Sequence, residues 1–341
     1  MLLIKGLLIR LVCFLAITAL PGRGTTCLQA QSQKINPSEY ATDWLIDGSS
    51  YIAEAVEDPG KSRIEIRNGL ISRTFTTSPN AATIGFDNLI TSETVLRGIK
   101  PEAKVAINGQ SYEVGGLKGQ PNYAFFKHEW LEVMKANPSA LQFVGYELSK
   151  PIVPFAWKMV RHHAGGSWPP KGVHLKMDYT TPSTDSVAFA VSVHYELYDG
   201  LPVMSKWITV VNKNTEPIRL DSFTSEILAA VEYGSAVESR EYQVNRPNIH
   251  VETDYAFASF NVDDANHHVV KWLPDPDYHT QVNYQKLTPC LLMVGPEVGP
   301  GVLIEPGETF QSFRTFVMLH DSYDRERNGL ALRRMYRTLA P

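Results

Sequence analysis

The sequence predicts an all-β protein built as a large antiparallel sandwich. Apolar and polar residues alternate over long stretches, turn signals separate these stretches, and helical periodicity is scarce before the C-terminus. With 43% hydrophobic and 20% charged residues, the 341-residue chain can fill a sizeable core, which excludes disordered, collagen-like and coiled-coil classes. We expect two large antiparallel sheets packed face to face.

The clearest strand signal covers residues 187–197, where apolar side chains occupy every second position. The positions between them become polar towards His194 and Glu196. The same alternation recurs over residues 173–179 and 313–319. Because successive side chains of a strand point to opposite faces, each segment has one face directed to a core.

Three turn signals separate predicted strands. Asn68-Gly69 and Asn108-Gly109 each lie between two apolar segments and predict hairpins with type I′ turns, because that turn needs positive φ at both central residues. The segment Tyr-Asp-Gly-Leu-Pro at 198–202 predicts a third hairpin with a longer loop.

Helical periodicity is clear in one segment, for which we predict a helix over about 324–339. Its apolar residues recur at helical spacing and are Leu332, Met335, Tyr336 and Leu339. A shorter helix is expected around 128–136, where Asn137-Pro138 would end it.

The first 30 residues are typical of a secretory signal. Lys5 and Arg10 precede the apolar run 11–20, and small or polar residues follow as far as Ala30. The run is short for a bilayer and no later stretch approaches the required length. We therefore expect cleavage after Ala30 and a secreted or periplasmic protein that does not span a membrane.

The cysteines agree with this interpretation. Cys27 raises the alternative of a lipoprotein, but residues 24–26 depart from the Leu-small-small pattern that usually precedes a lipidated cysteine. After cleavage only Cys290 remains, which forbids an internal disulfide. Cys290 opens the apolar run 290–294, so a buried, inert thiol is favoured over a nucleophile.

Several function classes are disfavoured. Thirty-two basic against 36 acidic residues give a formal charge of -4, which does not suit nucleic acid. The sequence holds no G-x-S-x-G elbow, Walker loop or dinucleotide fingerprint, and we expect no cofactor. The pairs His162-His163 and His267-His268 would point to opposite faces of a strand, so no metal site is expected.

The segment 266–279 is the predicted carbohydrate-binding site, because prolines 274 and 276 stiffen a loop rich in aromatic and polar side chains. The candidate residues are Trp272, Asp275, Asp277, Tyr278 and His279. Sugars stack their C–H faces on aromatic rings and hydrogen-bond to carboxylates and imidazoles. The alternative is a structural loop whose Trp272 packs on the sandwich. Asp275 and Asp277 could also be considered as the acid and base of a glycosidase, but a role as turn and cap residues is favoured for them.

A second aromatic and polar cluster allows the same two interpretations, and core packing is favoured for it. Its members are Tyr123, Phe125, Phe126, His128, Glu129 and Trp130.

Four segments together resemble a known family. They are residues 198–207 with Asn212, residues 301–316 with 319–321, the arginine-rich residues 333–337, and residues 68–73. In their order along the chain they resemble the N-terminal β-supersandwich of glycoside hydrolase family 36, the α-galactosidase group. The resemblance implies a galactose-mutarotase-like supersandwich over 31–320 and a connector helix over 321–341.

In that family a catalytic (β/α)₈ barrel with two aspartates follows the connector. A barrel takes roughly 250 residues, and no helix–strand alternation of that length precedes Pro341, so no catalytic residue is carried over. We expect a non-catalytic domain in carbohydrate metabolism that binds carbohydrate and works with a barrel in cis or on a partner chain.

Two alternatives stay open. One is a stand-alone carbohydrate-binding module that uses the 266–279 loop. The other is a sugar mutarotase with a His acid and a Glu base. His174, His194 and Glu196 lie on predicted strands, but nothing in the sequence brings a His and a Glu together.

Overall fold

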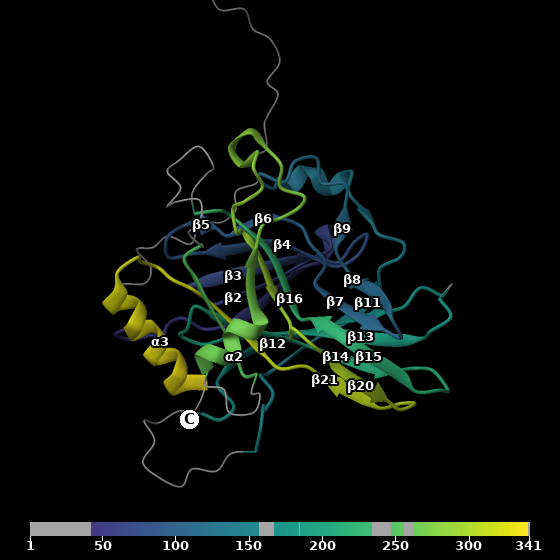
Figure 1. Cartoon of the computed structure of the whole chain (residues 1–341). Helices are drawn as coiled ribbons and strands as arrows, with labels where there is room; N and C mark the ends of the chain where they lie inside the picture. Colours follow the sequence, from purple (N-terminus) through teal and green to yellow (C-terminus); the bar gives the residue numbers. More distant parts are fainter. Residues whose placement is uncertain (1–41, 157–166, 184, 234–246, 256–261, 340–341) are drawn as a thin grey trace, which may run out of the picture. The chain divides into compact units, whose positions relative to one another are not determined.

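The computed structural model describes residues 42–156, 167–183, 185–233, 247–255 and 262–339 (Figure 1). Strands dominate these ranges, and the pairs of named strands are antiparallel, which confirms the all-β class. Residues 37–341 form one compact unit. The predicted signal segment 1–30 and the pair His162-His163 lie outside the described residues.

The largest sheet has seven strands in the order β11-β12-β13-β14-β22-β17, with β21 paired to β14. Their bounds are β11 (Gln142–Ser149), β12 (Gly172–Thr180), β13 (Phe189–Tyr198), β14 (Val203–Asn212), β22 (Thr315–Leu319), β17 (Ile249–Thr253) and β21 (Thr309–Gln311). The predicted strands at 173–179, 187–197 and 313–319 correspond to β12, β13 and β22. The hairpin predicted at 198–202 joins β13 to β14.

The remaining strands form smaller sheets. The five-stranded sheet contains β1 (Glu54–Asp58), β2 (Arg63–Arg67), β3 (Ile71–Thr76), β4 (Ala82–Asn88) and β5 (Glu93–Thr94). One four-stranded sheet contains β20 (Pro300–Ile304), β15 (Ile218–Thr224), β7 (Ala103–Ile107) and β8 (Gln110–Val114). The other contains β18 (Val270–Leu273), β19 (Leu291–Val294), β16 (Glu226–Ala230) and β6 (Leu96–Gly98). A short pair joins β9 (Leu117–Lys118) to β10 (Lys135–Ala136).

The expectation of two large sheets is therefore corrected, because the strands that face the seven-stranded sheet are divided among smaller ones. One division falls at Ser225, between the consecutive strands β15 and β16. There the Ser225 amide donates to the carbonyl of Val294 at 2.8 Å, and the chain passes from one four-stranded sheet to the other.

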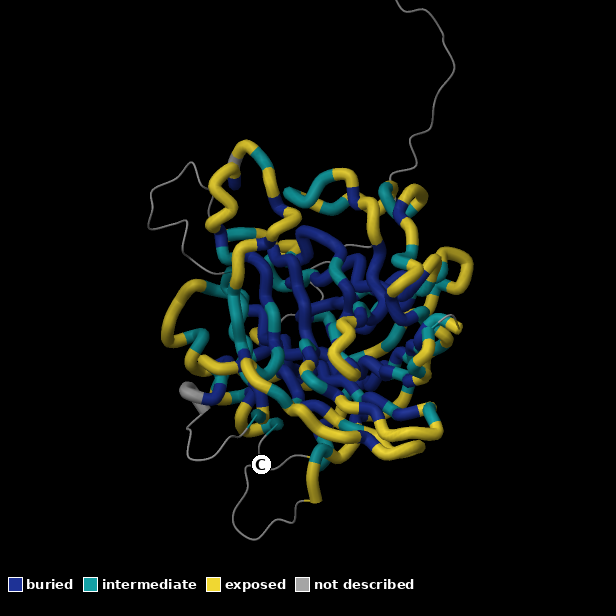
Figure 2. The backbone as a smooth tube through the Cα atoms, turned by 45° about the vertical axis from the view of Figure 1, so that its right-hand side comes forward, coloured by how far each residue is buried: buried dark blue, intermediate teal, exposed yellow. Residues whose placement is uncertain are grey.

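A single large core cluster draws side chains from the seven-stranded sheet and from all three smaller sheets with four or five strands. Buried backbone fills the centre of the molecule and exposed segments surround it (Figure 2). On β13, Val191, Val193 and Tyr195 enter this core. The alternate residues His194 and Glu196 point to the other face of the sheet, and they are buried as well.

The two Asn-Gly turns differ. Asn108 and Gly109 have φ of 51° and 80°, as a type I′ turn requires. At the other turn only Gly69 has positive φ, so a type I′ turn is wrong there. Instead the Asn68 side chain accepts hydrogen bonds from the amides of Leu70 and Ile71 and donates to two carbonyls at the β13–β14 turn.

The helix predicted at 324–339 is confirmed as α3 (Arg325–Leu339), which packs Ala331 and Met335 into a second core cluster. The helix expected at 128–136 is instead the short 3₁₀ turn η3 (His128–Glu132), and β10 begins three residues later. The other helical elements are α2 (Val262–Val269), η2 (Pro59–Lys61) and η4 (Gln281–Asn283). Within the described ranges, no helix is both long and apolar enough to cross a bilayer.

Candidate functional site

The predicted sugar-binding residues divide into buried and exposed members. Trp272 on β18 is partly buried and packs against the large core. Asp275 and Tyr278 are 0% and 1% exposed, whereas Asp277 and His279 lie on the surface. The loop therefore presents Asp277 and His279 to solvent, and the other three residues support it.

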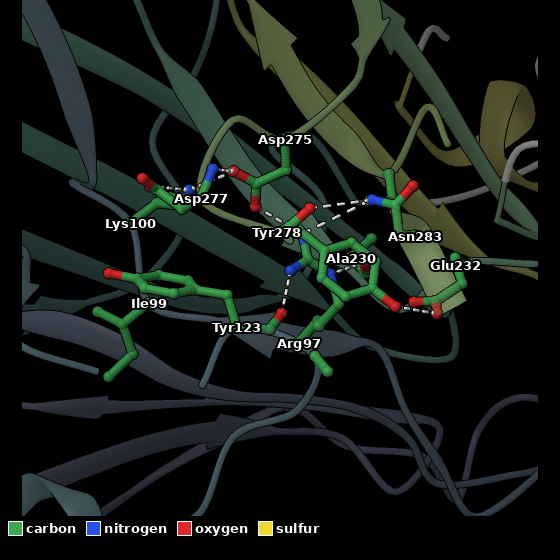
Figure 3. Close-up of polar contacts among 12 residues, drawn as sticks. Arg97, Ile99, Lys100, Tyr123, Ala230, Glu232, Asp275, Asp277, Tyr278 and Asn283 are labelled. Carbon is green, nitrogen blue, oxygen red and sulfur yellow. Dashed lines mark hydrogen bonds and ion pairs between the residues drawn. The ribbon is translucent and has the colours of Figure 1, made fainter. Parts of the chain in front are cut away.

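Asp275 is a buried anion held by two cations (Figure 3). Its carboxylate accepts hydrogen bonds from Arg97 Nη2 at 2.6 Å and from Lys100 Nζ at 2.7 Å. It also accepts the amide of Asp277 at 3.1 Å, which shapes the turn. Burial acts to raise the pKa of Asp275, but Lys100 and Arg97 outweigh it and hold the pKa below its ordinary value.

Arg97 ties this loop to the rest of the molecule. Its Nε donates to the carbonyl of Ala230 at 3.0 Å, and its Nη1 donates to the carbonyl of Tyr123. The guanidinium lies 4.2 Å from the ring centroid of Tyr278, whose hydroxyl donates to Glu232 at 2.5 Å. Asp275 and Tyr278 are thus positioning residues of the loop.

Arg97 and Lys100 also bring together the two clusters that are distant in sequence. Arg97 binds the backbone at Tyr123 and the side chain of Asp275, while Lys100 Nζ lies 5.2 Å from the Tyr123 ring and 2.7 Å from Asp277. Neither cation stood out in the sequence, because an isolated Arg or Lys near a strand carries no pattern. Only the fold shows that both clusters share one end of the sandwich.

The 123–130 cluster is itself divided. Phe126 and Trp130 pack against a small core cluster, as the core-packing interpretation requires. Phe125 remains 45% exposed, 5.3 Å from the Trp130 ring, with Lys127 Nζ 5.5 Å from its own ring centroid. An exposed ring near surface charges is chemically suited to a pyranose face.

A second polar group lies on the face of the seven-stranded sheet that points away from the large core. It consists of His174 on β12, His194 and Glu196 on β13, Trp207 on β14 and Arg314 just before β22. Strand register aligns them, because His174 pairs with Glu196 and His194 pairs with Trp207. All five residues are at most 6% exposed.

The two imidazoles have partners at every ring nitrogen. His174 Nδ1 is 2.9 Å from Ser149 Oγ, His174 Nε2 is 3.1 Å from His194 Nδ1, and His194 Nε2 is 3.1 Å from Thr209 Oγ1. Both rings lie within 8° of parallel to the Trp207 indole. Burial, with Arg314 adding to it, lowers the pKa of His174 to about 4.

Burial and the neighbouring His174 lower the pKa of His194 to about 3. Both imidazoles are therefore neutral at pH 7.

Glu196 is similarly constrained. Its Oε1 accepts the amide of Ile152 at 2.7 Å, and its Oε2 accepts the Tyr198 hydroxyl and Arg314 Nη1, both at 2.8 Å. Burial raises the pKa of Glu196, while Arg314 acts in the opposite direction. The Arg314 guanidinium carbon lies 3.9 Å from the Trp207 ring centroid.

The pairing of His174 with Glu196 brings a His and a Glu together, which the sequence alone did not show. Nothing in the sequence joined a His to a Glu, yet register makes His174 and Glu196 direct cross-strand neighbours, with Cβ atoms about 4.5–5.5 Å apart by general strand geometry. The signal was the alternation of polar residues on two strands that form one hairpin. It could not be used because the connection between them is long enough to permit several registers.

The remaining candidates of the sequence are structural. Cys290 is a free, buried thiol whose pKa burial raises, with Arg97 Nη2 3.5 Å from its sulfur, so the inert interpretation is supported. His267 and His268 lie in the last turn of α2, not on a strand. In the described part of the chain, no group of three or more His, Cys, Asp or Glu residues is arranged to hold a metal ion.

No protein-family model matches this sequence, and no curated protein sequence matches it. Among solved structures, the chain is similar to a family 36 α-galactosidase of Geobacillus stearothermophilus, with 12% identity and a TM-score of 0.41 over 79% of this chain and 41% of that one. It is also similar to a putative aldose 1-epimerase of Klebsiella pneumoniae, with 9% identity and a TM-score of 0.40 over 81% and 83% of the two chains.

A galactose mutarotase-related enzyme of Lactobacillus acidophilus has 11% identity and a TM-score of 0.35 over 80% of this chain and 99% of its own. The present chain spans less than half the length of the α-galactosidase. Similarities at 9–12% identity do not reveal what a chain binds or catalyses. A function for this chain is therefore argued from its own side chains.

Proposed function

We propose that this chain is a non-catalytic, carbohydrate-binding β-sandwich domain of a secreted α-galactosidase-like glycoside hydrolase. Its catalytic (β/α)₈ barrel would be supplied in cis or by a partner chain. Support comes from the four sequence segments that resemble family 36, which here form the β13–β14 hairpin, the strands from β20 to β22, helix α3 and the β2–β3 turn.

One observation carries the non-catalytic part of the proposal: the buried groups that could act as an acid and a base, on the sheet face and at Asp275, already have internal partners. Each nitrogen of His174 and His194 has one, and Glu196 accepts three hydrogen bonds. Asp275 is paired with two cations. A general acid or base must reach the proton that it transfers, and these groups are engaged elsewhere.

Hydrolysis by the purified chain tests this proposal. We expect no release of galactose from raffinose or from a chromogenic α-galactoside, whereas an active α-galactosidase assayed in parallel gives release. Release that follows the purified protein and disappears in Glu196→Gln or in Asp275→Asn would contradict the proposal, because it would assign catalysis to this chain.

The carbohydrate site is proposed at the end of the sandwich that carries both loops. There Phe125 offers a ring face, and Asp277 and His279 offer polar groups, while Asp275 and Tyr278 position the loop and Trp272 supports it from the core. A pyranose ring stacked on Phe125 would hydrogen-bond to the surface carboxylate.

Titration calorimetry with raffinose tests this site. Phe125→Ala is expected to weaken binding by roughly three- to tenfold, the range for one aromatic contact. Val133→Ala is a matched control, because Val133 is a 61% exposed apolar residue of the same segment outside the proposed contact. Equal affinities for the wild type and Phe125→Ala would remove the site.

A sugar mutarotase is a second candidate, favoured by one observation: His174 and Glu196 are paired across adjacent strands. Polarimetry of freshly dissolved α-D-galactose distinguishes it. The non-catalytic proposal expects the spontaneous rate, and acceleration that is lost in His174→Gln would establish the mutarotase instead.

Secretion is also part of the proposal and concerns residues 1–30. Mass spectrometry of the exported protein is expected to give a chain that starts at Gln31. A chain that starts at Cys27 and carries lipid mass would establish the lipoprotein alternative, and a cytosolic chain that retains Met1 would contradict export.

A further inference from the structure

We propose that Trp207 and Arg314 form a second binding subsite on the seven-stranded sheet, which takes a hydroxyl group of a neutral sugar. This subsite goes beyond the proposed function, because it uses residues at a different place from the loop site and needs no catalytic partner. It is a binding role only, with no bond made or broken.

The observation behind the subsite is a pair of buried hydrogen-bond donors that have no acceptor among the described residues. Trp207 is 0% exposed and Arg314 is 3% exposed, yet Trp207 Nε1 and Arg314 Nη2 have no hydrogen-bond partner among the described residues. A buried donor without an acceptor costs about 1–3 kcal/mol, so native proteins rarely leave one without a reason. Two such donors in contact point to an acceptor that is not part of the protein.

Geometry places both donors in one small region. The Arg314 guanidinium carbon lies 3.9 Å from the Trp207 ring centroid, so the guanidinium lies over the indole face and both donors belong to one side-chain contact. Arg314 is fixed there, because its Nη1 donates to Glu196 and its backbone amide donates to Asp254 at 2.6 Å. The free Nη2 is therefore the part of a rigid guanidinium that remains available for a ligand.

The surrounding charges select the ligand class. Arg314 is already neutralised by Glu196 at 2.8 Å, and nearby Lys176 is paired with Asp178 at 3.3 Å. A carboxylate or phosphate ligand would find no uncompensated cation and would add a buried charge. A hydroxyl oxygen is an uncharged acceptor, so it can accept a hydrogen bond from such a donor without adding a charge.

Indole N–H resonances test this directly. The chain has six tryptophans, and Trp207→Phe identifies the Trp207 signal. On titration of the ¹⁵N-labelled protein with D-galactose, we expect that signal to move downfield and saturate as Nε1 gains an acceptor. The Trp44 signal should not move, because its Nε1 already donates to Asp321 at 2.8 Å. The Trp130 signal reports separately on the loop site.

Affinity provides the second readout. Trp207→Phe keeps an aromatic ring and removes one donor, so galactose binding monitored on the remaining signals of the sheet face should weaken roughly three- to tenfold. Trp44→Phe is the matched control and should leave the affinity unchanged. If Trp207→Phe does not fold, Arg314→Lys serves instead, because it keeps the charge that pairs with Glu196 and removes Nη2.

The contradicting results are distinct. A Trp207 signal that stays unchanged at galactose concentrations that saturate the Trp130 signal would overturn the subsite and leave the loop site standing. Tighter binding of galacturonate than of galactose at the Trp207 signal would overturn the assignment of a neutral ligand.

Discussion

Lys206 and Trp207 are consecutive residues of β14 that face opposite sides of the same sheet. Their surroundings differ in whether the polar group of the side chain has a partner. Lys206 points inward, where its Nζ donates to Glu226 at 2.8 Å within a buried group of two cations and two carboxylates that includes Arg73 and Glu102. Trp207 points outward, where its indole N–H has no partner among the described residues.

The two faces differ in whether their buried polar groups have partners. On the inner face every charge has an opposite charge nearby, and the network joins strands β3, β14 and β16 of three different sheets. Such a closed network fixes how the sheets pack. On the outer face the donors of Trp207 and Arg314 remain available, and an available buried donor is what a ligand can use.

The largest expected effect is the loss of one charge from the inner network. Glu226→Gln removes the nearer of the two carboxylates that Arg73 and Lys206 share and should lower the free energy of unfolding by about 3–5 kcal/mol. Urea denaturation measures it. The control Glu297→Gln affects an exposed pair with His268 and should cost less than about 1 kcal/mol. Equal losses in both variants would show that the network is not a structural element.

The outer face of the sheet should make the stability of the protein depend on pH, because it carries two buried imidazoles. The lowered pKa values of His174 and His194, about 4 and about 3, mean that the folded state binds fewer protons than the unfolded state, whose imidazoles titrate near 6.5. Their contribution to stability is complete above pH 6.5 and is lost as pH falls towards 4 and 3. Each imidazole contributes a slope of up to about 1.4 kcal/mol per pH unit.

Urea midpoints at pH 7 and pH 5 check this slope. Between these values the wild type should lose more stability than the double variant His174→Gln and His194→Gln, which keeps hydrogen-bonding groups and cannot titrate. The carboxyl of Glu226 does not interfere, because its pKa is lowered to about 2 by Arg73 and Lys206 against the effect of burial. Parallel pH dependence in the two proteins would contradict neutral, buried imidazoles.

A smaller effect distinguishes a partnered indole from an unpartnered one. Trp44→Phe removes a hydrogen bond to Asp321, whereas Trp207→Phe removes a donor that has no acceptor. Both variants lose a similar volume, which lowers the free energy of unfolding by a similar amount. Trp44→Phe should lower it by about 1–2 kcal/mol more, because it also loses a hydrogen bond. Trp207→Phe should show no such additional loss. A larger loss in Trp207→Phe would mean that its N–H is already satisfied.

The smallest effect is expected at the surface of the loop. Asp277 shares Lys100 with Asp275, but it is 53% exposed, so Asp277→Asn should change stability by less than about 1 kcal/mol. The matched change Asp275→Asn affects a fully buried carboxylate and should cost several times more. Thermal unfolding of both variants compares them, and equal effects would contradict the assignment of Asp275 as the positioning residue.

The sequence predicted local features better than distant ones. Alternation located β12, β13 and β22, and helical spacing located α3, because each pattern is contained within one element. The division into several sheets, the cations at Arg97 and Lys100, and the pairing of His174 with Glu196 all depend on contacts between segments far apart in the chain. Of the predicted sugar-binding residues, Asp275 and Tyr278 are buried because Arg97, some 180 residues earlier, binds both.

NMR exchange spectroscopy of D-galactose with the purified chain tests the proposal that this domain binds a neutral sugar without converting it. We expect the protein to broaden the galactose signals, as binding requires, while the α and β anomers interconvert at their spontaneous rate. Accelerated interconversion that is lost in His174→Gln would contradict it and would make the outer face of the sheet an active site.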